Sequence, residues 1–265
     1  MTGTREDGDG LPKLAERPIR FGLDRWYVRL LLAVTLIALA WPMDRAVAVW
    51  SIEMAKHGPE LLTDFRRTAQ QFGESMGIAM IAIAIWGTDR AKRRPLILAI
   101  GVIFLTGGIA SGLKLLGGRE RPHLQLNDGR TVWHGPVMPG EMDPDPSFPS
   151  GHTTAAFALA LCLTRMYPKG SPAFVLLASL CGVSRFLSGK HFVTDALAGA
   201  WLGWEAARLM WDYQLAGLCR FIDGFVPPFS VYPAWDWDRM EQHRVERQHD
   251  RPERGLNDDA VHSLV

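Results

Sequence analysis

Long apolar runs, separated by short polar segments, constrain the fold of this chain more than any other feature of its sequence. Several of them approach the length of about 20 residues that an α-helix needs to cross the hydrocarbon core of a bilayer. The six runs lie at about 26–41, 72–86, 95–116, 150–166, 172–187 and 191–211. The sequence therefore predicts an all-α fold, an integral membrane six-helix bundle that occupies residues 26–211.

The composition agrees with apolar blocks that alternate with polar ones. Hydrophobic residues make up 48% of the 265 residues and charged residues 22%, yet the mean hydropathy is close to zero. A formal net charge of +1, without a long basic run, gives no argument for nucleic acid as a partner. Of the three cysteines, Cys162 and Cys181 lie inside apolar runs, which is typical of small buried hydrophobic residues.

Basic residues cluster at alternate turns between the runs, and this predicts the orientation of the chain in the membrane. With the N-terminus inside, the basic positions within 17–29, 90–94 and 165–169 all fall on the cytoplasmic side, as the positive-inside rule requires. Residues 1–25 then form a polar cytoplasmic leader, and residues 212–265 form a polar cytoplasmic tail. The predicted location is the inner (cytoplasmic) membrane.

Other interpretations of the apolar runs remain open. The first run, with Ala46-Val47-Ala48 after it, also resembles a cleaved signal peptide, although the polar leader is long and more apolar segments follow. A soluble all-helical protein is a second alternative, which the length of the runs disfavours. The mixed segment 43–71 is predicted to be an interfacial amphipathic segment. Gly199 and Gly203 form a G-x-x-x-G spacing, which permits close packing of helices in lipid.

Three polar motifs share the extracytoplasmic face in this topology. They are Lys114-x6-Arg121-Pro122, Pro149-Ser150-Gly151-His152 and Ser184-Arg185-x5-His191-x3-Asp195. The first motif ends the third helix, the second begins the fourth, and the third joins the fifth helix to the sixth. Because the pattern of apolar runs does not force this agreement, we expect the motif side chains to form one site.

The third motif has the residue types of an activated nucleophile. If the segment after the Ser188-Gly189 break is helical, His191 and Asp195 lie one turn apart on one face. The Asp195 carboxylate can then accept a hydrogen bond from one imidazole nitrogen of His191. The other ring nitrogen is left as a base or as a nucleophile.

Phosphate is the ligand that the basic residues of the motifs favour. Arg121 offers a planar fork to phosphate oxygens, Lys114 offers a point charge, and Arg185 is a third cation. Arg119 has the same chemistry, but its spacing ties it less clearly to the site. For Lys114, extension of the side chain to the membrane interface is the structural alternative.

The second motif predicts a helix N-terminus that binds an anion. Pro149 and Gly151 at the start of a helix expose backbone N–H groups, with the positive end of the helix dipole behind them. Ser150 can add a hydroxyl donor, and His152, in the first turn, can protonate a leaving oxygen. Taken alone, this motif is equally compatible with a helix cap.

Together the motifs predict phosphoryl transfer through a covalent phosphohistidine. His191 would attack phosphorus while the cations, Ser150 and the Gly151 N–H hold the oxygens on which charge develops. His152 would protonate the departing alkoxide and then activate the water that hydrolyses the intermediate. Because side chains supply the positive charge and the sequence has no Cys/His metal spacing, neither a metal nor another cofactor is expected.

The three motifs resemble the signature of the type 2 phosphatidic acid phosphatase superfamily, K-x6-R-P, P-S-G-H and S-R-x5-H-x3-D. The chain matches this signature without a gap or substitution, over about residues 95–211. The resemblance implies a six-helix, metal-independent membrane phosphatase that acts on lipid phosphates or diphosphates. It implies that His191 is the nucleophile, Asp195 its orienting acid and His152 the general acid. The implied phosphate-binding residues are Lys114, Arg121, Ser150, Gly151 and Arg185.

The resemblance leaves several functions open. The family also includes soluble vanadate-dependent haloperoxidases, which the apolar runs argue against, and lipid phosphotransferases, which use the same phosphohistidine. A protein that only binds or transports a lipid headgroup would need the cations but not an oriented pair of His191 and Asp195. Candidate substrates of a phosphatase are polyprenyl diphosphate, phosphatidylglycerol phosphate, phosphatidate and a phosphorylated lipid A. In the loop at 123–148, Trp133, His134 and Met138 are predicted to pack at the interface, with contact to the substrate as the alternative.

Overall fold

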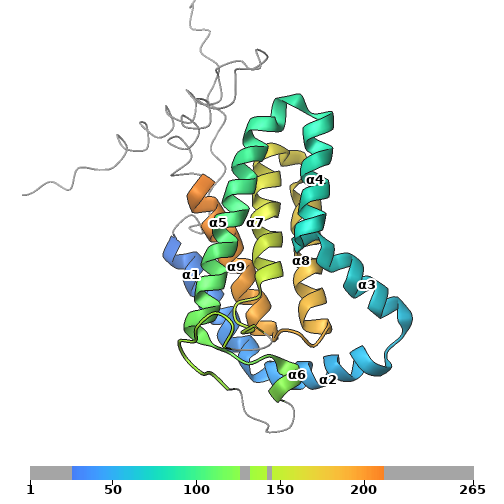
Figure 1. Cartoon of the computed structure of the whole chain (residues 1–265), viewed down its shortest axis with the longest axis vertical. Helices are drawn as coiled ribbons and strands as arrows, with labels where there is room; N and C mark the ends of the chain where they lie inside the picture. The colour runs from blue at the N-terminus through green and yellow to red at the C-terminus, as the bar shows by residue number, and fades with distance from the viewer. Residues whose placement is uncertain (1–25, 126–131, 142–144, 212–265) are drawn as a thin grey trace, which may run out of the picture.

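The computed structural model describes residues 26–125, 132–141 and 145–211, and these are mostly helical (Figure 1). Within these ranges β-pairing is confined to one isolated bridge, between Arg119 and Trp133. The predicted all-α class is therefore confirmed. The predicted leader, residues 1–25, and the predicted tail, residues 212–265, lie outside the described residues.

Each apolar run of the sequence contains one helix of the structure. The helices are α1 (Trp26–Ala40), α2 (Asp44–His57), α3 (Glu60–Gln70), α4 (Ser75–Thr88), α5 (Arg93–Gly117), α6 (Pro122–Gln125), α7 (Gly151–Met166), α8 (Ser171–Leu187) and α9 (Val193–Leu209). The runs correspond to α1, α4, α5, α7, α8 and α9. The mixed segment 43–71 folds as α2 and α3, which meet at the Gly58-Pro59 break.

The described part of the chain contains three stretches that are long and apolar enough to cross a membrane. They are Tyr27–His57, Arg90–Gly117 and Pro168–Leu187, and α4 is a shorter apolar helix. On the outer faces of α4 and α5, large apolar side chains such as Ile83 and Phe104 are 72% and 79% exposed. Such exposure is expected where lipid rather than water surrounds a helix.

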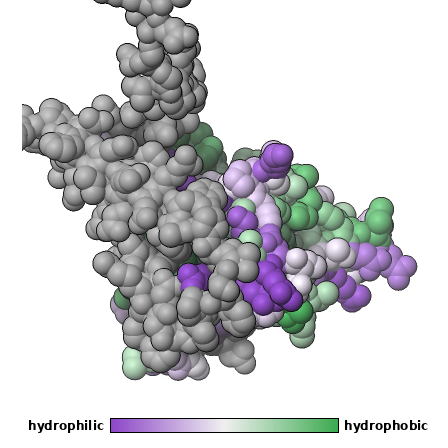
Figure 2. Space-filling view, turned by 90° about the horizontal axis from the view of Figure 1, so that it is seen from above, coloured by the Kyte–Doolittle hydropathy of each residue, from purple (hydrophilic) through white to green (hydrophobic). Residues whose placement is uncertain are grey.

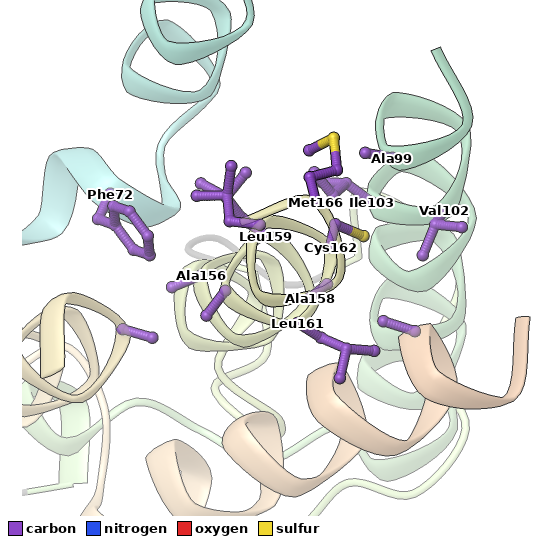
Figure 3. Close-up of a cluster of buried hydrophobic side chains, with 14 of the residues drawn as sticks. Phe72, Ala99, Val102, Ile103, Ala156, Ala158, Leu159, Leu161, Cys162 and Met166 are labelled. Atoms are coloured by element: carbon purple, nitrogen blue, oxygen red, sulfur yellow. The ribbon is translucent and has the colours of Figure 1, made fainter. Parts of the chain in front are cut away.

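Helix α7 lies at the centre of the bundle and packs against α5, α8 and α9. Figure 3 shows Leu159, Leu161, Cys162 and Met166 of α7 directed at neighbouring helices. The small residues Ala156, Ala158 and Ala160 are fully buried and allow the neighbours to approach closely. The core of the bundle is therefore built around one helix, whose N-terminus carries Gly151 and His152.

Close packing at the G-x-x-x-G spacing of α9 is confirmed. A Cβ atom added to Gly203 would lie 2.2 Å from the backbone oxygen of Thr154, and one added to Gly199 would lie 2.7 Å from that of Ser150. No larger residue fits at either position without moving α7 or α9. The two glycines thus fix the distance between the helices that begin next to the second and third motifs.

The helix directions bring the three motifs to one end of the bundle. Helices α5 and α8 end where α7 and α9 begin, and α2 lies across this end (Figure 1). The opposite end carries the basic turns at 90–94 and 165–169. Figure 2 looks onto that opposite end and shows hydrophilic side chains beside the hydrophobic surface of the bundle. In the described part of the molecule, the motifs and these basic turns therefore lie at opposite ends of the bundle, as the sequence predicts.

Candidate active site

A cavity of about 490 Å³ opens at the end of the bundle where the motifs meet. Its lining residues are Lys114, Arg121, His123, Asp145, Gly151, His152, Arg185, Lys190 and His191. Most of the residues predicted for the site are in this set. Ser150 and Asp195 are not in it, and both are fully buried behind the lining.

Helix ends place four of the nine lining residues. Lys114 is in the last turn of α5, Arg185 is in the last turn of α8, and Gly151 and His152 are in the first turn of α7. The Cε atom of Lys114 lies 4.0 Å from the position of a Cβ atom at Gly151, so the lysine reaches the α7 N-terminus. The cavity therefore combines a helix N-terminus with cationic side chains, as an anion site requires.

A left-handed glycine makes the turn that presents His191. Gly189 has a φ of 65°, and a Cβ atom there would lie 2.7 Å from the side chain of Ile52 on α2. Both the conformation and the contact with α2 require glycine. The turn carries Lys190 to the surface and His191 into the protein, where its side chain is 2% exposed.

The partner that fixes the His191 ring differs from the predicted one. Nδ1 of His191 lies 2.9 Å from the backbone oxygen of Ser147 but 3.6 Å from Oδ2 of Asp195. Nδ1 therefore donates its hydrogen to the Ser147 carbonyl, and Asp195 contributes mainly its nearby negative charge. With the hydrogen on Nδ1, the lone pair of Nε2 is free.

The helical register of His191 and Asp195 also differs from the prediction. Helix α9 begins at Val193, so His191 precedes the helix. The reason is the role of Asp195 at the third helical position, where its Oδ2 accepts a hydrogen bond of 2.8 Å from the Phe192 N–H. A carboxylate at this position ends the extended segment and starts the helix, as in a capping box.

Burial lowers the pKa of His191 from 6.5 to about 4, although the nearby Asp195 carboxylate acts in the opposite direction. A charged imidazole loses its hydration when it is buried, and the neutral form is then favoured. The ring is therefore neutral at pH 7, which is the state a nitrogen nucleophile needs.

Two of the cations are held in place by hydrogen bonds. Nε of Arg121 donates to the backbone oxygen of Asp145 at 2.7 Å, and Nη1 of Arg185 donates to Oε1 of Gln70 at 2.6 Å. Gln70 is the last residue of α3, so the mixed segment supports the site directly. Both side chains line the cavity, where their guanidinium groups can donate to phosphate oxygens.

Lys190 and His123 are lining residues that the sequence did not single out. Both are exposed at the cavity and lie next to motif residues, Lys190 before His191 and His123 after Pro122. Burial, with the nearby positive charges of Arg185 and Arg121, lowers the pKa of Lys190. Adjacency to a motif was the available signal, but the motif positions alone do not say which neighbours face the cavity.

Ser150 is placed differently from the other predicted phosphate ligands. Its hydroxyl accepts a hydrogen bond of 2.9 Å from Oγ1 of Thr153, and its N–H donates to the backbone oxygen of Asp195 at 3.0 Å. The second bond joins the start of α7 to the start of α9. In the structure Ser150 thus connects two parts of the site, and its contact with phosphate stays a prediction.

The loop tryptophan packs on two aromatic rings of the protein although it is 40% exposed, and its packing at the membrane interface stays a prediction. Trp133 stacks on Trp41 at a centroid distance of 6.4 Å and lies 5.4 Å from the Phe148 ring. His134 lies 2.7 Å from the Glu120 carboxylate, and the side chain of Met138 is 67% exposed. In the described part of the chain, no cluster of three His, Cys, Asp or Glu side chains is arranged to hold a metal ion.

Comparisons with known proteins agree with the motifs. The sequence model of the PAP2 superfamily matches residues 95–217. The chain is 27% identical over 215 residues to a lipid A 1-phosphatase of Rhizobium etli, which covers 73% of this chain and 88% of the relative. It is 32% identical over 164 residues to a decaprenylphosphoryl-5-phosphoribose phosphatase of Mycolicibacterium smegmatis, covering 60% of this chain and 82% of the relative.

A solved structure shares the fold. The transmembrane PAP2-type phosphatidylglycerolphosphate phosphatase of Bacillus subtilis superimposes with a TM-score of 0.50 at 21% identity, over 77% of this chain and 98% of that chain. The match to the family model and the two relatives, rather than this structure, confirm the family and the predicted class of enzyme, a phosphatase. The chain belongs to the PAP2 superfamily.

Proposed function

We propose that this protein is an integral membrane phosphatase that hydrolyses a lipid phosphate or diphosphate through a phosphohistidine intermediate. The observation that carries this proposal is the cavity itself. His152 and His191, a helix N-terminus and the cations Lys114, Arg121 and Arg185 line one space at the end of an apolar bundle. The relatives named above carry phosphatase names with lipid substrates, which supports the same substrate class.

The first half of the reaction makes a bond between nitrogen and phosphorus. Nε2 of His191, with its free lone pair, attacks the phosphorus atom while the bond from phosphorus to the leaving oxygen breaks. Lys114, Arg121, Arg185 and the Gly151 N–H hold the equatorial oxygens, whose charge they stabilise. His152 gives its proton to the leaving oxygen. The leaving group is the lipid alcohol if the substrate is a monophosphate, and a lipid monophosphate if the substrate is a diphosphate.

The second half returns the enzyme to its starting state. Neutral His152 accepts a proton from a water molecule as that water attacks the phosphohistidine. The bond between Nε2 and phosphorus breaks, inorganic phosphate is released, and His191 regains its lone pair. All of the groups in these steps belong to the chain, so we expect hydrolysis to proceed in the presence of a chelator.

The proposed topology places this chemistry on the extracytoplasmic side of the inner membrane. We propose that α1, α4, α5, α7, α8 and α9 cross the bilayer, that α2 and α3 lie at the interface, and that residues 26–211 form the phosphatase domain. The basic turns at the far end of the bundle support this orientation. The leader and the tail are then cytoplasmic.

Phosphate release by the detergent-purified protein, with excess chelator, tests the proposal. The panel contains polyprenyl diphosphate, phosphatidylglycerol phosphate, phosphatidate and phosphorylated lipid A, and His191→Ala is assayed beside the wild type. We expect release from at least one lipid and a loss of at least about a thousandfold in the variant, because the nucleophile is gone.

Two alternatives predict different outcomes in the same assay. A phosphotransferase releases little phosphate but passes the phosphoryl group to an added alcohol, and His191→Ala abolishes that transfer. If the protein only binds a lipid headgroup, the wild type and His191→Ala both bind the lipid, and neither releases phosphate nor transfers it. Release that persists in His191→Ala, or release that requires a metal ion, contradicts the proposed mechanism.

A further inference from the structure

One fully buried arginine connects the nucleophile segment to α2. The Arg119 side chain has 0% exposure, and its Nη1 lies 2.5 Å from Oδ1 of Asp195. Its Nη2 donates to Oδ2 of Asp44 at 2.9 Å, and the side chain of Asp44 is 5% exposed. A guanidinium in such a place is retained only when its charge is compensated, and here two carboxylates compensate it.

Aromatic rings enclose the Arg119 guanidinium on its faces. The Cζ atom lies 3.9 Å from the centre of the Phe192 ring, 5.1 Å from that of Trp41 and 5.2 Å from that of Trp133. These contacts exclude water and fix the plane of the fork. Because Phe192 is the residue between His191 and α9, the ring that covers Arg119 moves with the nucleophile segment.

Asp44 also binds the start of α9 directly. Its Oδ1 accepts a hydrogen bond of 3.0 Å from the Thr194 N–H, and its Oδ2 accepts one from the Thr194 hydroxyl. The Thr194 hydroxyl in turn accepts a hydrogen bond of 2.8 Å from Nη1 of Arg119. Asp44 therefore satisfies a free N–H group at the N-terminus of α9 from a different helix, and it begins α2 itself.

The charges of this cluster suit the reaction intermediate. Asp44 and Asp195 carry two negative charges and Arg119 carries one positive charge, so the buried cluster has a net charge of −1 next to His191. A phosphorylated imidazole that keeps its Nδ1 hydrogen carries a positive charge. The cluster can therefore offset the charge that develops on His191 when the bond to phosphorus forms.

We propose that Arg119 and Asp44 are positioning residues that hold Asp195, whose carboxylate binds the Phe192 N–H next to His191 and supplies negative charge beside the ring for phosphoryl transfer. Neither side chain lines the cavity, so neither touches the substrate. Asp44 lies outside residues 95–217, which match the family. In this proposal the start of α2 supports the site from outside the part of the sequence that matches the family. This inference rests on the proposed function.

A double-mutant cycle between Asp44 and Asp195 tests the proposal. Asp44→Asn keeps the shape of the side chain but removes its charge and one acceptor for Arg119. We expect kcat to fall by about tenfold or more, because small displacements of reacting groups are costly. KM should change by less than about twofold, because the cations that bind phosphate are untouched. In an Asp195→Asn background, the same change should have almost no further effect on kcat.

Arg119→Lys is the second variant, and it keeps the proposal testable if Asp44→Asn folds poorly. It keeps the charge but loses the fork, so it cannot hold Asp44 and Asp195 together. The same pattern is expected, with kcat reduced, KM retained and little additional loss in the Asp195→Asn background. Glu205→Gln is the matched control, because Glu205 is a buried acid of α9 that pairs with Arg29 at 2.6 Å away from the cavity.

The outcomes separate a positioning role from a purely structural one. The inference is overturned if the losses in kcat of the single variants multiply in the double variants. It is also overturned if Glu205→Gln lowers kcat as much as Asp44→Asn does when the two variants have equal thermal stability. Losses that disappear in the Asp195→Asn background support it. Phosphate release by the wild type decides the proposed function separately, because the inference depends on ratios between variants.

Discussion

At the scale of single residues, the proposed role of His191 as the nucleophile predicts how the enzyme responds to acid. Its pKa is lowered to about 4 by burial, so the imidazole keeps its lone pair well below the ordinary histidine pKa of 6.5. We expect the loss of kcat/KM on acidification that comes from protonation of His191 to have its midpoint near pH 4. A midpoint of the acid limb at pH 6 or above would show that His191 is not desolvated as the structure indicates.

The same lowered pKa affects stability in a defined pH range. Between pH 6.5 and pH 4 the unfolded chain binds a proton at His191 and the folded chain does not. The contribution of His191 to the free energy of unfolding is therefore constant above pH 6.5 and decreases as the pH falls toward 4. Thermal unfolding in detergent as a function of pH, compared with His191→Gln, isolates this contribution.

Individual residues also show where the sequence stops being informative. The motifs identified most of the cavity lining, because spacing along helices and at helix ends is a local property. Ser147 was missed because a backbone carbonyl has no sequence signal. Asp44 was missed because it lies far from the motifs in sequence and meets Arg119 only through the fold.

At the scale of helices, the packing of α7 against α9 can be tested at Gly203. Gly203→Ala places a Cβ atom 2.2 Å from the Thr154 carbonyl oxygen, so the helices must move apart. We expect the variant to lose about 1–3 kcal/mol of stability through overpacking and to lose activity, because α7 and α9 position His152 and His191. Thermal unfolding and phosphate release are the measurements.

Gly101→Ala is the control for that experiment. A Cβ atom at Gly101 meets nothing within 4 Å, so the substitution adds only helix propensity to α5. We expect unchanged activity and equal or greater stability, by up to about 1 kcal/mol. Equal unfolding temperatures for the two variants would contradict the close approach of α7 and α9.

The helices themselves were predictable, and their ends were less so. Apolar runs found α1, α4, α5, α7, α8 and α9, because hydrophobic length is the strongest helix signal in a chain of this kind. The start of α9 was placed too early, since Asp195 caps the helix from its third position. The arrangement of α2 across the end of the bundle depends on contacts with α8 and α9, which no local pattern specifies.

At the scale of the whole molecule, the proposed orientation can be tested by labelling from outside. Ala91→Cys lies in the turn between α4 and α5, and Met138→Cys lies beside the site end; both positions are exposed. Cys162 and Cys181 are buried, and Cys219, outside the described residues, is replaced by serine. In intact cells an impermeant maleimide should label Met138→Cys alone, and after lysis it should label both. The reverse pattern would place the active site in the cytoplasm.

The location of the cavity at the end of the bundle also has a consequence for the direction of the reaction. For a lipid substrate, cleavage at this depth produces one product that stays dissolved in the bilayer and one that diffuses into the aqueous compartment. The two products leave in different phases, and the aqueous product is diluted into the aqueous compartment. Reversal would need both products to meet again in the same cavity, so we expect the separation of the products between two phases to keep the reverse reaction slow, while the equilibrium constant of the hydrolysis is unchanged.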